Sequence, residues 1–296
     1  MDNQIDILLE NNFGFKPRNS VLLGGYSSRV WEVEINQDRN LVVKILKDQN
    51  DKDLLHHQAE VAFSRAVNST GVIQTLKFIP DTKGQTIHRL HQDGDDYFVV
   101  IEPHPIVHKV DLSKEEQQNL GHLMSVVHSM FVDFDHPGLG TTKYMREVNL
   151  VEMDLIAQAF PDEGYKSYLK FMQPLDYQTL GLTTTVIHGD WHQANMSFTQ
   201  PPFLFDLETL ARGTRVEELA RTITHWWMEP TAKKVFFENL VRGYQDLTQA
   251  ELEIIPQLAI TQLYRKYAEF ISYNDPKNAN RVRESIPVIK SLFNLP

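Results

Sequence analysis

The sequence contains no cysteine. This absence excludes disulfide bonds, thiolate nucleophiles and zinc sites built from cysteine. An excess of basic residues is absent as well, because 29 Lys and Arg stand against 39 Asp and Glu and give a formal net charge of -10. Proteins that bind nucleic acid draw much of their affinity from neutralising phosphates. We therefore expect no nucleic-acid partner.

Long apolar runs are also lacking, and none approaches the ~20 residues that a membrane-spanning helix needs. Residues 1–12 contain no basic side chain, which is not typical of a signal peptide. We therefore expect a cytoplasmic protein with no membrane partner. The 296 residues are 42% hydrophobic, which is enough for one large domain or two lobes.

Strand and helix signals divide the chain near residues 103–112. Apolar runs that alternate or are β-branched indicate strands at 19–25, 29–35, 41–46, 74–79, 97–101 and 183–187 and a hairpin at 196–205. Helical spacing of apolar residues indicates helices at 52–67 and near 113–130, 150–159, 165–180, 215–228, 232–245, 250–274 and 280–293. The sequence thus predicts an α+β fold with a strand-rich lobe of residues 1–104 and a mainly helical lobe of residues 105–296.

Two features of the first lobe bear on chemistry. The turn from Gly24 to Ser28 has small residues that let backbone N–H groups approach a phosphate, although an ordinary hairpin turn has the same composition. Lys44 lies within the apolar strand 41–46, either on the solvent face or as a buried cation, which needs a partner. Glu60, on the following helix, is the partner that we expect for a buried Lys44.

The segment 188–195, HGDWHQAN, follows a β-branched strand. In phosphoryl transfer an acid orients the attacking hydroxyl and an amide oxygen helps to hold Mg²⁺, and Asp190 and Asn195 are of these types. His188 and His192 also have the four-residue spacing of zinc ligands on a helix, but a glycine and the preceding strand argue against a helix. A hydrogen-bonded loop without chemistry is the remaining alternative.

Asp206 ends the apolar strand 203–205, eleven residues after Asn195 and across the hairpin. This connection can bring the two side chains together, and Mg²⁺ prefers such oxygen ligands. Asp206 is therefore the predicted metal ligand, with a strand-end residue that caps the next turn as the alternative. Glu208 is either a second acid at the metal or a surface residue.

The order of these features is that of a protein kinase: glycine turn, strand lysine, helix glutamate, HxDxxxxN loop, hairpin and strand-end Asp. The segments VIHGDWHQANMSF and FLFDLETLARG resemble those of the aminoglycoside phosphotransferase and choline kinase superfamily, and so does GHLMSVVH at 121–128. Residues 213–220 resemble the family's Gly-Asp-Pro-x-x-Asp-Leu-Ala. Glu218 stands where an Asp is usual, and Thr214 replaces another Asp, which bears on the substrate class more than on catalysis.

The resemblance implies a bilobal protein-kinase-like fold, with a small antiparallel sheet in the first lobe and ATP or GTP in the cleft. It implies that Ser27 and Ser28 cover the phosphates, and that Lys44 contacts the α- and β-phosphates and pairs with Glu60. The connector Glu102-Pro103-His104 would present backbone groups to the purine. Glu102 and His104 are accordingly predicted nucleotide-binding residues.

For catalysis, the resemblance implies that Asp190 orients the acceptor hydroxyl, His188 braces the loop, and Asn195 and Asp206 hold Mg²⁺. The implied activity is phosphoryl transfer from ATP or GTP to a hydroxyl of a small metabolite or an aminoglycoside-like compound, by a monomer or a homodimer. A nucleotide-binding pseudokinase with a regulatory role is the alternative, although the joint presence of these residues and Lys44 argues against it. A protein kinase is disfavoured, because the segment after Asp206 is too short to dock a polypeptide.

The acceptor has weaker signals. Four aromatic residues could surround a choline-like cation or belong to the helical core: Trp191, Trp226, Trp227 and Tyr264. An acidic stretch at 147–163 could attract an aminoglycoside or form a solvated helix face. From Arg265 onward, six Lys and Arg oppose three acids, a net charge of +3. This tail favours an uncharged or singly charged hydroxylated metabolite over a polycationic antibiotic.

Overall fold

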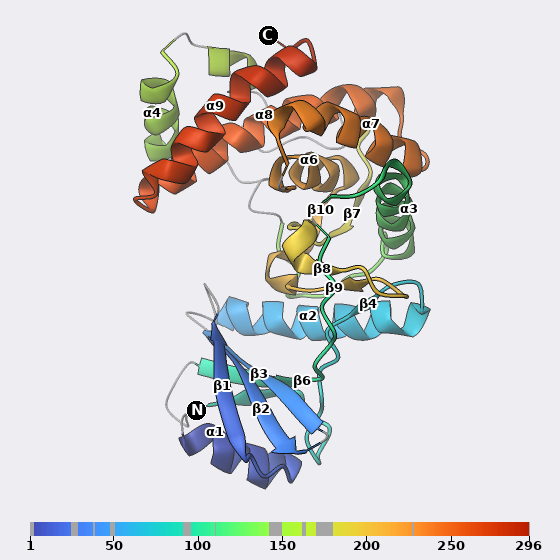
Figure 1. Ribbon diagram of the computed structural model, residues 1–296, viewed down its shortest axis with the longest axis vertical. Coiled ribbons are helices and arrows are strands. Elements are labelled where there is room, and N and C mark those ends of the chain that lie inside the picture. Colours follow the sequence, from blue (N-terminus) through green and yellow to red (C-terminus); the bar gives the residue numbers. More distant parts are fainter. Residues whose placement is uncertain are drawn as a thin grey trace. The chain divides into compact units, whose positions relative to one another are not determined.

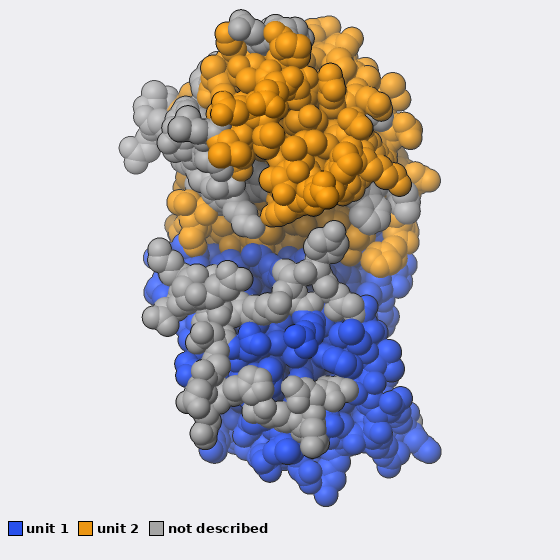
Figure 2. Space-filling view, turned by 90° about the vertical axis from the view of Figure 1, so that its left-hand side faces the viewer, with its two compact units in different colours: residues 1–107, 135–139, 196–208 blue, residues 108–134, 140–195, 209–296 orange. Residues whose placement is uncertain are grey.

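The computed structural model describes residues 3–24, 29–37, 39–47, 51–90, 96–109, 111–141, 150–161, 164–169, 180–226 and 228–295. The chain forms two compact units, which are coloured separately in Figure 2. Unit 1 comprises Met1–Val107, Asp135–Leu139 and Met196–Glu208, and unit 2 comprises His108–Phe134, Gly140–Asn195 and Thr209–Pro296. Unit 1 therefore includes a segment from the second half of the sequence. The functional boundary at residue 104 stays a prediction.

Unit 1 is built on a 5-stranded antiparallel sheet (Figure 1). In spatial order its strands are β1 (Asn19–Gly24), β2 (Arg29–Asn36), β3 (Arg39–Lys47), β6 (Asp96–Ile101) and β5 (Ile87–Arg89). Within central strand β3, Lys44 is opposite Val30 of β2 and Val99 of β6. Because strands on both sides pair with it, the backbone of Lys44 is held in a fixed register.

The two faces of this sheet carry different side chains of β3, since successive residues of a strand point to opposite faces. The face that packs on helix α1 (Asn3–Leu8) and its π-helical continuation η1 (Leu9–Phe13) carries the apolar residues Leu41, Val43 and Ile45. The other face packs on helix α2 (Asp51–Thr70) and carries Val42 and Leu46. By this alternation Lys44 lies on the α2 face, away from the core under α1.

A second sheet in unit 1 has the order β4-β9-β8, with β4 at Gln74–Thr75, β9 at Phe203–Leu204 and β8 at Met196–Ser197. β8 and β9 form the antiparallel hairpin that the sequence predicts, and β4 pairs with β9 in parallel. The Thr75 hydroxyl donates to the Leu204 carbonyl oxygen at 2.7 Å. This pairing places the residues after β9, including Asp206, in the same unit as Lys44.

Unit 2 is mainly helical around a two-stranded antiparallel pair, β7 (Thr184–Ile187) and β10 (Ala211–Thr214). Its helices are α3 (Lys114–Met130), α4 (Leu150–Ala159), α6 (Arg215–His225), α7 (Lys233–Gly243), α8 (Gln249–Ser272) and α9 (Pro276–Leu292). Short 3-10 turns elsewhere in the chain are η2 (Gly164–Tyr168), η3 (Gln193–Asn195), η4 (Leu207–Thr209) and η5 (Pro230–Ala232). Helix α8 packs against both α6 and α9, so the residues of these three helices form one wall of unit 2.

Local sequence explains where the helices of unit 2 begin. At the start of α3, the Ser113 hydroxyl accepts from the Glu116 amide at 3.2 Å, and the Glu116 carboxylate accepts from the Ser113 amide at 2.8 Å. This reciprocal pair is a capping box. Thr214 and Glu217 form the same arrangement at the start of α6, which fixes α6 directly after β10.

The predicted α+β fold, with a small antiparallel sheet and a mainly helical part, is confirmed. Helix α1 and strands β5 and β10 are not predicted from the sequence, because each is too short to show a periodic pattern. Of the helix predicted at 165–180, Gly164–Tyr168 is a 3-10 turn, and residues 170–179 lie outside the described ranges. Among the described residues, no helix is long and apolar enough to cross a membrane.

Candidate active site

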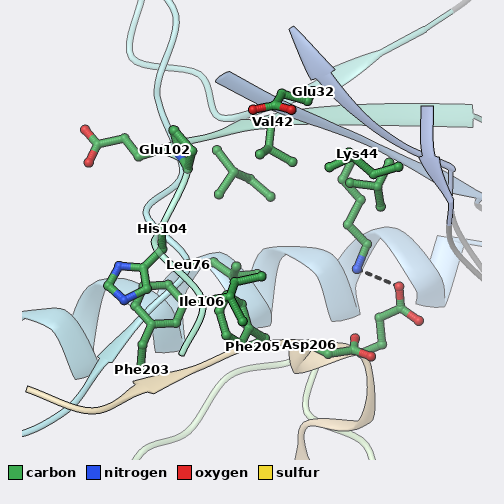
Figure 3. Close-up of a pocket in the computed structure, with 15 residues that line it drawn as sticks. Glu32, Val42, Lys44, Leu76, Glu102, His104, Ile106, Phe203, Phe205 and Asp206 are labelled. Carbon is green, nitrogen blue, oxygen red and sulfur yellow. Dashed lines mark ion pairs between the residues drawn. The ribbon is translucent and has the colours of Figure 1, made fainter. Parts of the chain in front are cut away.

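Unit 1 contains a pocket of about 480 Å³ on the α2 side of the sheet (Figure 3). Its walls are largely apolar and include Val30, Val42, Leu76, Ile101, Ile106, Phe203 and Phe205. The charged residues of its lining are Glu32, Lys44, Glu102, Asp206 and Glu208. An apolar pocket with a few convergent polar groups is typical of sites for small ligands. The ammonium group of Lys44 would suit a ligand that also has an anionic group.

The charge of Lys44 is balanced inside this pocket. Its Nζ lies 2.6 Å from Oε1 of Glu208 (dashed line in Figure 3), and the Lys44 side chain is only 10% exposed. Burial alone would lower the pKa of Lys44, but the carboxylates of Glu60, Glu208 and Asp206 together raise it. Lys44 therefore stays charged. The sequence predicted an ion pair with Glu60, whereas the ion pair in the structure is with Glu208.

Glu60 does not form the predicted ion pair with Lys44, and its carboxylate contacts a histidine instead. Nδ1 of His57 lies 3.0 Å from Oε1 of Glu60, whose side chain is almost fully buried. Glu60 still acts on Lys44 through its charge. The neighbouring His56 donates from Nε2 to the carbonyl oxygen of Glu208 at 3.0 Å. Helix α2 thus supplies a buried negative charge and also fixes the backbone of the residue that pairs with Lys44.

Asp206 occupies a backbone conformation that few residues adopt. Its φ is 50°, in the left-handed region where Asp is among the better-tolerated non-glycine residues. Strand β9 ends two residues earlier and the 3-10 turn η4 begins one residue later. The chain reverses here, and Asp206 lines the pocket with Lys44 (Figure 3). Unusual backbone conformations of this kind concentrate at functional sites.

The predicted connector, Glu102-Pro103-His104, also lines the pocket. The Glu102 amide donates to the Lys77 carbonyl oxygen at 2.9 Å, and proline has no N–H, so the next amide in the connector is that of His104. The His104 ring stacks on Phe203, with ring centroids 3.7 Å apart (Figure 3). Ser27 and Ser28, predicted to cover phosphates, lie outside the described residues.

In unit 2 the loop after β7 is anchored by Glu218 of α6. This carboxylate is fully buried and accepts from the amides of His188 at 2.5 Å and Gly189 at 3.0 Å. Burial would raise the pKa of Glu218, but His128, His188 and the Gly189 amide outweigh it and lower that pKa. Gly189 has a φ of +80°, and a Cβ there would lie 2.7 Å from the Thr209 carbonyl oxygen. The loop conformation therefore requires glycine at this position.

The carboxylate of Asp190 accepts hydrogen bonds from three side chains. Nδ1 of His225 lies 2.6 Å from Oδ1, Nε2 of His192 lies 3.3 Å from Oδ2, and Nδ2 of Asn195 donates to Oδ2 at 3.0 Å. Burial would raise the pKa of Asp190, but the bonds from His192 and His225 hold it well below the usual range. The Asp190 side chain remains 25% exposed. A carboxylate has about four acceptor positions, so one is left for a ligand, on Oδ1.

The hydrogen bonds assign the proton positions of the histidines around Asp190. His192 accepts from the Ala194 amide through Nδ1 at 3.1 Å, so its proton lies on Nε2, toward Asp190. Burial, followed by the charge of Lys266, lowers the pKa of His225 to about 3, so neutral His225 donates from Nδ1. His188 accepts from the Asp190 amide through Nδ1 at 3.2 Å. The predicted brace, His188, therefore contacts the backbone of Asp190.

The orientation of the Asn195 amide follows from its contacts. Nδ2 donates both to the Asp190 carbonyl oxygen and to Asp190 Oδ2, each at 3.0 Å. Both partners are acceptors, so the nitrogen must face them and Oδ1 is left to accept from, or coordinate, a ligand. An amide oxygen here and the Asp206 carboxylate in unit 1 are hard donors of the type that Mg²⁺ takes, usually with phosphates and water completing the shell. The donor types therefore fit a magnesium–nucleotide complex.

With this geometry described, comparison with known proteins decides the family. The model of the phosphotransferase enzyme family (APH) matches residues 19–254. The chain belongs to this phosphotransferase family. The match covers every described residue around Lys44, Asp190 and Asp206, so the predicted superfamily is confirmed.

Relatives of this phosphotransferase are kinases. Stress response kinase A of Salmonella choleraesuis and the serine/threonine protein kinase RdoA of Salmonella typhimurium are each 23% identical to it over 280 residues, which cover 86% of this chain and 78% of theirs. The solved structure of amicoumacin kinase hAmiN in complex with AMP-PNP, Ca²⁺ and Ami is 14% identical, with a TM-score of 0.73 and coverage of 97% of this chain and 93% of that chain. The last likeness shows that the phosphotransferase shares the fold.

Sequence reasoning missed three residues of this phosphotransferase's candidate site. The sequence left Glu208 as either a second acid at the metal or a surface residue. It related Glu218 to the substrate class, and no sequence pattern indicated a role for His225. Each acts through a contact distant in sequence: Lys44 for Glu208, the 188–189 amides for Glu218, and Asp190 for His225. Of the predicted aromatic walls, Trp191, Trp226 and Tyr264 are buried, and Trp227 lies outside the described residues.

Proposed function

We propose that the protein is a small-molecule kinase, which transfers the γ-phosphoryl group of ATP, or GTP, to a hydroxyl of a small metabolite. The observation that carries this proposal is the carboxylate of Asp190, which three donors hold in place while one acceptor position on Oδ1 remains for a hydroxyl. The family match and the kinase relatives support it.

The pocket of unit 1 would bind the nucleotide. Its apolar walls and the exposed face of the His104 connector suit a purine, with the Glu102 carbonyl and the His104 amide as the backbone groups available to its edge. Lys44 would contact the α- and β-phosphates, and its raised pKa keeps the ammonium charged over the physiological range. Ser27 and Ser28 remain the predicted cover for the phosphates.

Asp190 would orient the acceptor hydroxyl through a hydrogen bond to Oδ1. The hydroxyl oxygen forms a bond to the γ-phosphorus, the bond from that phosphorus to the β-bridging oxygen breaks, and ADP leaves. The hydroxyl proton passes to Asp190. Because the pKa of Asp190 is lowered, this carboxylate is a weak base, and it takes the proton only as the new bond forms. Positioning therefore contributes more than base strength, which suits a loose transition state.

Oδ1 of Asn195 and the carboxylate of Asp206 would hold Mg²⁺, which supplies charge neutralisation at the phosphate oxygens. Glu208 is best assigned to Lys44 rather than to the metal, since the 2.6 Å ion pair already occupies its Oε1. Glu218, through the amides of His188 and Gly189, would keep the loop in the conformation that presents Asp190.

The direct test is a coupled ADP-release screen with ATP and with GTP, over amino alcohols, sugars, hydroxy acids, hydroxylated amino acids and aminoglycosides. We expect acceptor-dependent ADP release with at least one class, and loss of it in Asp190→Asn and Asp206→Ala enzymes that circular dichroism shows to be folded at the assay temperature. A polypeptide acceptor such as casein serves as the comparison class.

Three outcomes would contradict the proposal. Silence with both nucleotides and every acceptor, together with nucleotide binding, would indicate a regulatory nucleotide-binding protein. Phosphorylation of casein alone would indicate a protein kinase. A fully active Asp206→Ala enzyme would remove the metal assignment.

A further inference from the structure

A second pocket, of about 170 Å³, lies in unit 2 among helices α6, α8 and α9. His225 lines it, and the same side chain donates to Asp190 at 2.6 Å. The pocket therefore adjoins the hydrogen-bond network of the proposed catalytic carboxylate. It is smaller than the ~300–1,000 Å³ of typical ligand sites, so it suits a small metabolite or one end of a larger one.

The charged groups of this second pocket all have the same sign. Three cations line it, Lys233, Lys266 and Arg281, and no Asp or Glu occurs among the described residues of its lining. Asn278 and Ser285 add neutral polar groups. A lining of this kind is complementary to an anion and repels a cation.

One of the three cations has a role in the fold. Nζ of Lys233 donates to the carbonyl oxygens of Ile223 at 2.7 Å, Thr224 at 3.3 Å and Trp226 at 3.0 Å. These carbonyls belong to the last turn of α6, where a helix leaves acceptors unsatisfied and favours positive charge. Lys233 is therefore used in closing α6, and burial, followed by the charges of Lys266 and Arg281, lowers its pKa to about 7.

Lys266 and Arg281 have no comparable role. Across the described parts of the chain, neither forms an ion pair with a carboxylate, and the ammonium of Lys266 lies 5.8 Å from the centroid of the Phe270 ring. Burial lowers the pKa of Lys266 and the charge of Arg221 lowers it further, while Asp190 and Glu269 raise it. Lys266 is partly exposed and Arg281 is exposed, and like charges that line one pocket repel one another unless an anion joins them.

We propose that this second pocket binds a carboxylate or phosphate group of the acceptor through Lys266 and Arg281, so that the acceptor is a small hydroxylated anion. The inference rests on the proposed kinase function and names the substrate class of the same site. His225 lines this pocket and donates to Asp190 at 2.6 Å, so a small acceptor could reach both the pocket and the proposed catalytic carboxylate. A polycationic aminoglycoside does not fit such a lining.

Matched acceptors on one carbon frame provide the test: glycerate and glycerol 3-phosphate as anions, glyceramide and glycerol as neutral analogues, and aminopropanediol as the cation. The same pairings extend to hydroxy acids and sugar phosphates of four to six carbons. We expect kcat/KM to be at least about tenfold higher for an anion than for its neutral analogue, as charge-assisted bonds imply. The acid and phosphate arms show which anionic group is used.

Variants then assign the preference to this pocket. In Lys266→Gln and Arg281→Gln enzymes we expect KM for the anionic acceptor to rise about tenfold each, with a smaller change in kcat. Lys266→Glu should shift the preference toward the cationic analogue. Arg283→Gln is the matched control, because Arg283 is exposed on α9 as Arg281 is, but it does not line the pocket.

Neutral or cationic acceptors that work as well as their anionic partners, with KM unchanged in Lys266→Gln, would overturn this inference and leave the kinase function intact. If no acceptor is phosphorylated, the second pocket is tested by binding alone. Orthophosphate and glycerate are each titrated into the protein saturated with AMP-PNP and Mg²⁺. Saturable binding that Lys266→Gln and Arg281→Gln abolish and Arg283→Gln retains supports the pocket, and absent binding overturns it. Loss of all ATP consumption while anions still bind would count against the kinase function alone.

Discussion

The pocket of unit 1 and the second pocket of unit 2 are each lined by a lysine, buried in the case of Lys44 and partly exposed in the case of Lys266, and the two lysines have different surroundings. Three carboxylates raise the pKa of Lys44, one of them in an ion pair of 2.6 Å. Burial and a neighbouring arginine lower the pKa of Lys266. The protein therefore balances the charge of Lys44 by an ion pair, whereas Asp190 and Glu269 offset the charge of Lys266 only in part, and the proposed anion would complete the balance. We infer that the two pockets handle different partners, a nucleotide whose charges a metal shares and a small anion.

Asp190→Asn removes the group that both pockets would serve, and it should have the largest effect. The amide keeps the shape but loses one acceptor oxygen, so the acceptor hydroxyl loses its partner. We expect kcat to fall by about a thousandfold, together with a lower urea midpoint, because the donors to this carboxylate lose a charged partner. Steady-state kinetics and equilibrium unfolding measure the two quantities. An Asp190→Asn enzyme with wild-type kcat would show that this carboxylate does not act on the acceptor.

Lys44→Met tests the balanced pocket alone. Loss of the ammonium removes the cation that lies 2.6 Å from Glu208 and the proposed contact to the phosphates, so we expect kcat/KM for ATP to fall about a hundredfold. Lys16→Met is the control, because Lys16 is 81% exposed in a surface pair with Glu10 and such pairs contribute little. Glu208→Gln should be milder than Lys44→Met, since two carboxylates remain. A Glu208→Gln enzyme as impaired as Lys44→Met would contradict this account of the pair.

Glu218→Gln tests whether the negative charge of Glu218 stabilises the 188–195 loop. The neutral amide weakens the bonds from the His188 and Gly189 amides, and hydrogen bonds to charged groups are worth more than neutral ones. We expect the free energy of unfolding to fall by about 2 kcal/mol, together with a loss of kcat. Urea denaturation measures the first, with the exposed Glu253→Gln as control. Equal stability of the two variants would remove Glu218 as the anchor.

His225→Gln tests the link between Asp190 and the second pocket, with the smallest expected effect. One hydrogen bond to a charged group is worth about 1.5 kcal/mol, or about tenfold in kcat. His122→Gln, on the exposed side of α3, is the control.

His225 should also make the stability of the wild-type protein depend on pH in a defined direction. Unfolded His225 takes up a proton near pH 6.5, whereas native His225, with its pKa lowered to about 3, does not. The unfolded state thus binds more protons as pH falls from about 6.5 toward 3, and the native protein loses stability over that window. His225→Gln should flatten the slope of unfolding free energy above about pH 5, where Asp190 is largely ionised in both states. An unchanged slope would count against a neutral, buried His225.

The sequence predicts local features well and distant contacts poorly. Lys44 lies in the predicted strand, and the 188–195 loop follows the predicted strand, because alternation and β-branching act within a few residues. The choice of Glu208 over Glu60 depends on how His57 occupies Glu60, which no local pattern records. The same holds for His225, whose meaning appears only when α6 and the loop lie side by side.

The second pocket could be predicted from the sequence only in part. The basic excess after Arg265 was visible in the sequence and argued against a polycationic acceptor. Its sharper meaning required the structure, because Lys266 comes from α8 and Arg281 from α9, and the packing of these helices puts both at one pocket. The composition shows that the end of the chain is basic, and the structure shows that two of these basic residues line one pocket.

Phosphorus-31 NMR of the products tests the central claim most directly. With wild-type protein, ATP, Mg²⁺ and a hydroxylated acceptor from the screen, we predict a new phosphate monoester and ADP in equal amounts, and neither product with Asp190→Asn. ADP with free phosphate in place of the monoester, whatever acceptor is present, or an Asp190→Asn enzyme that forms the monoester at the wild-type rate, would contradict the account.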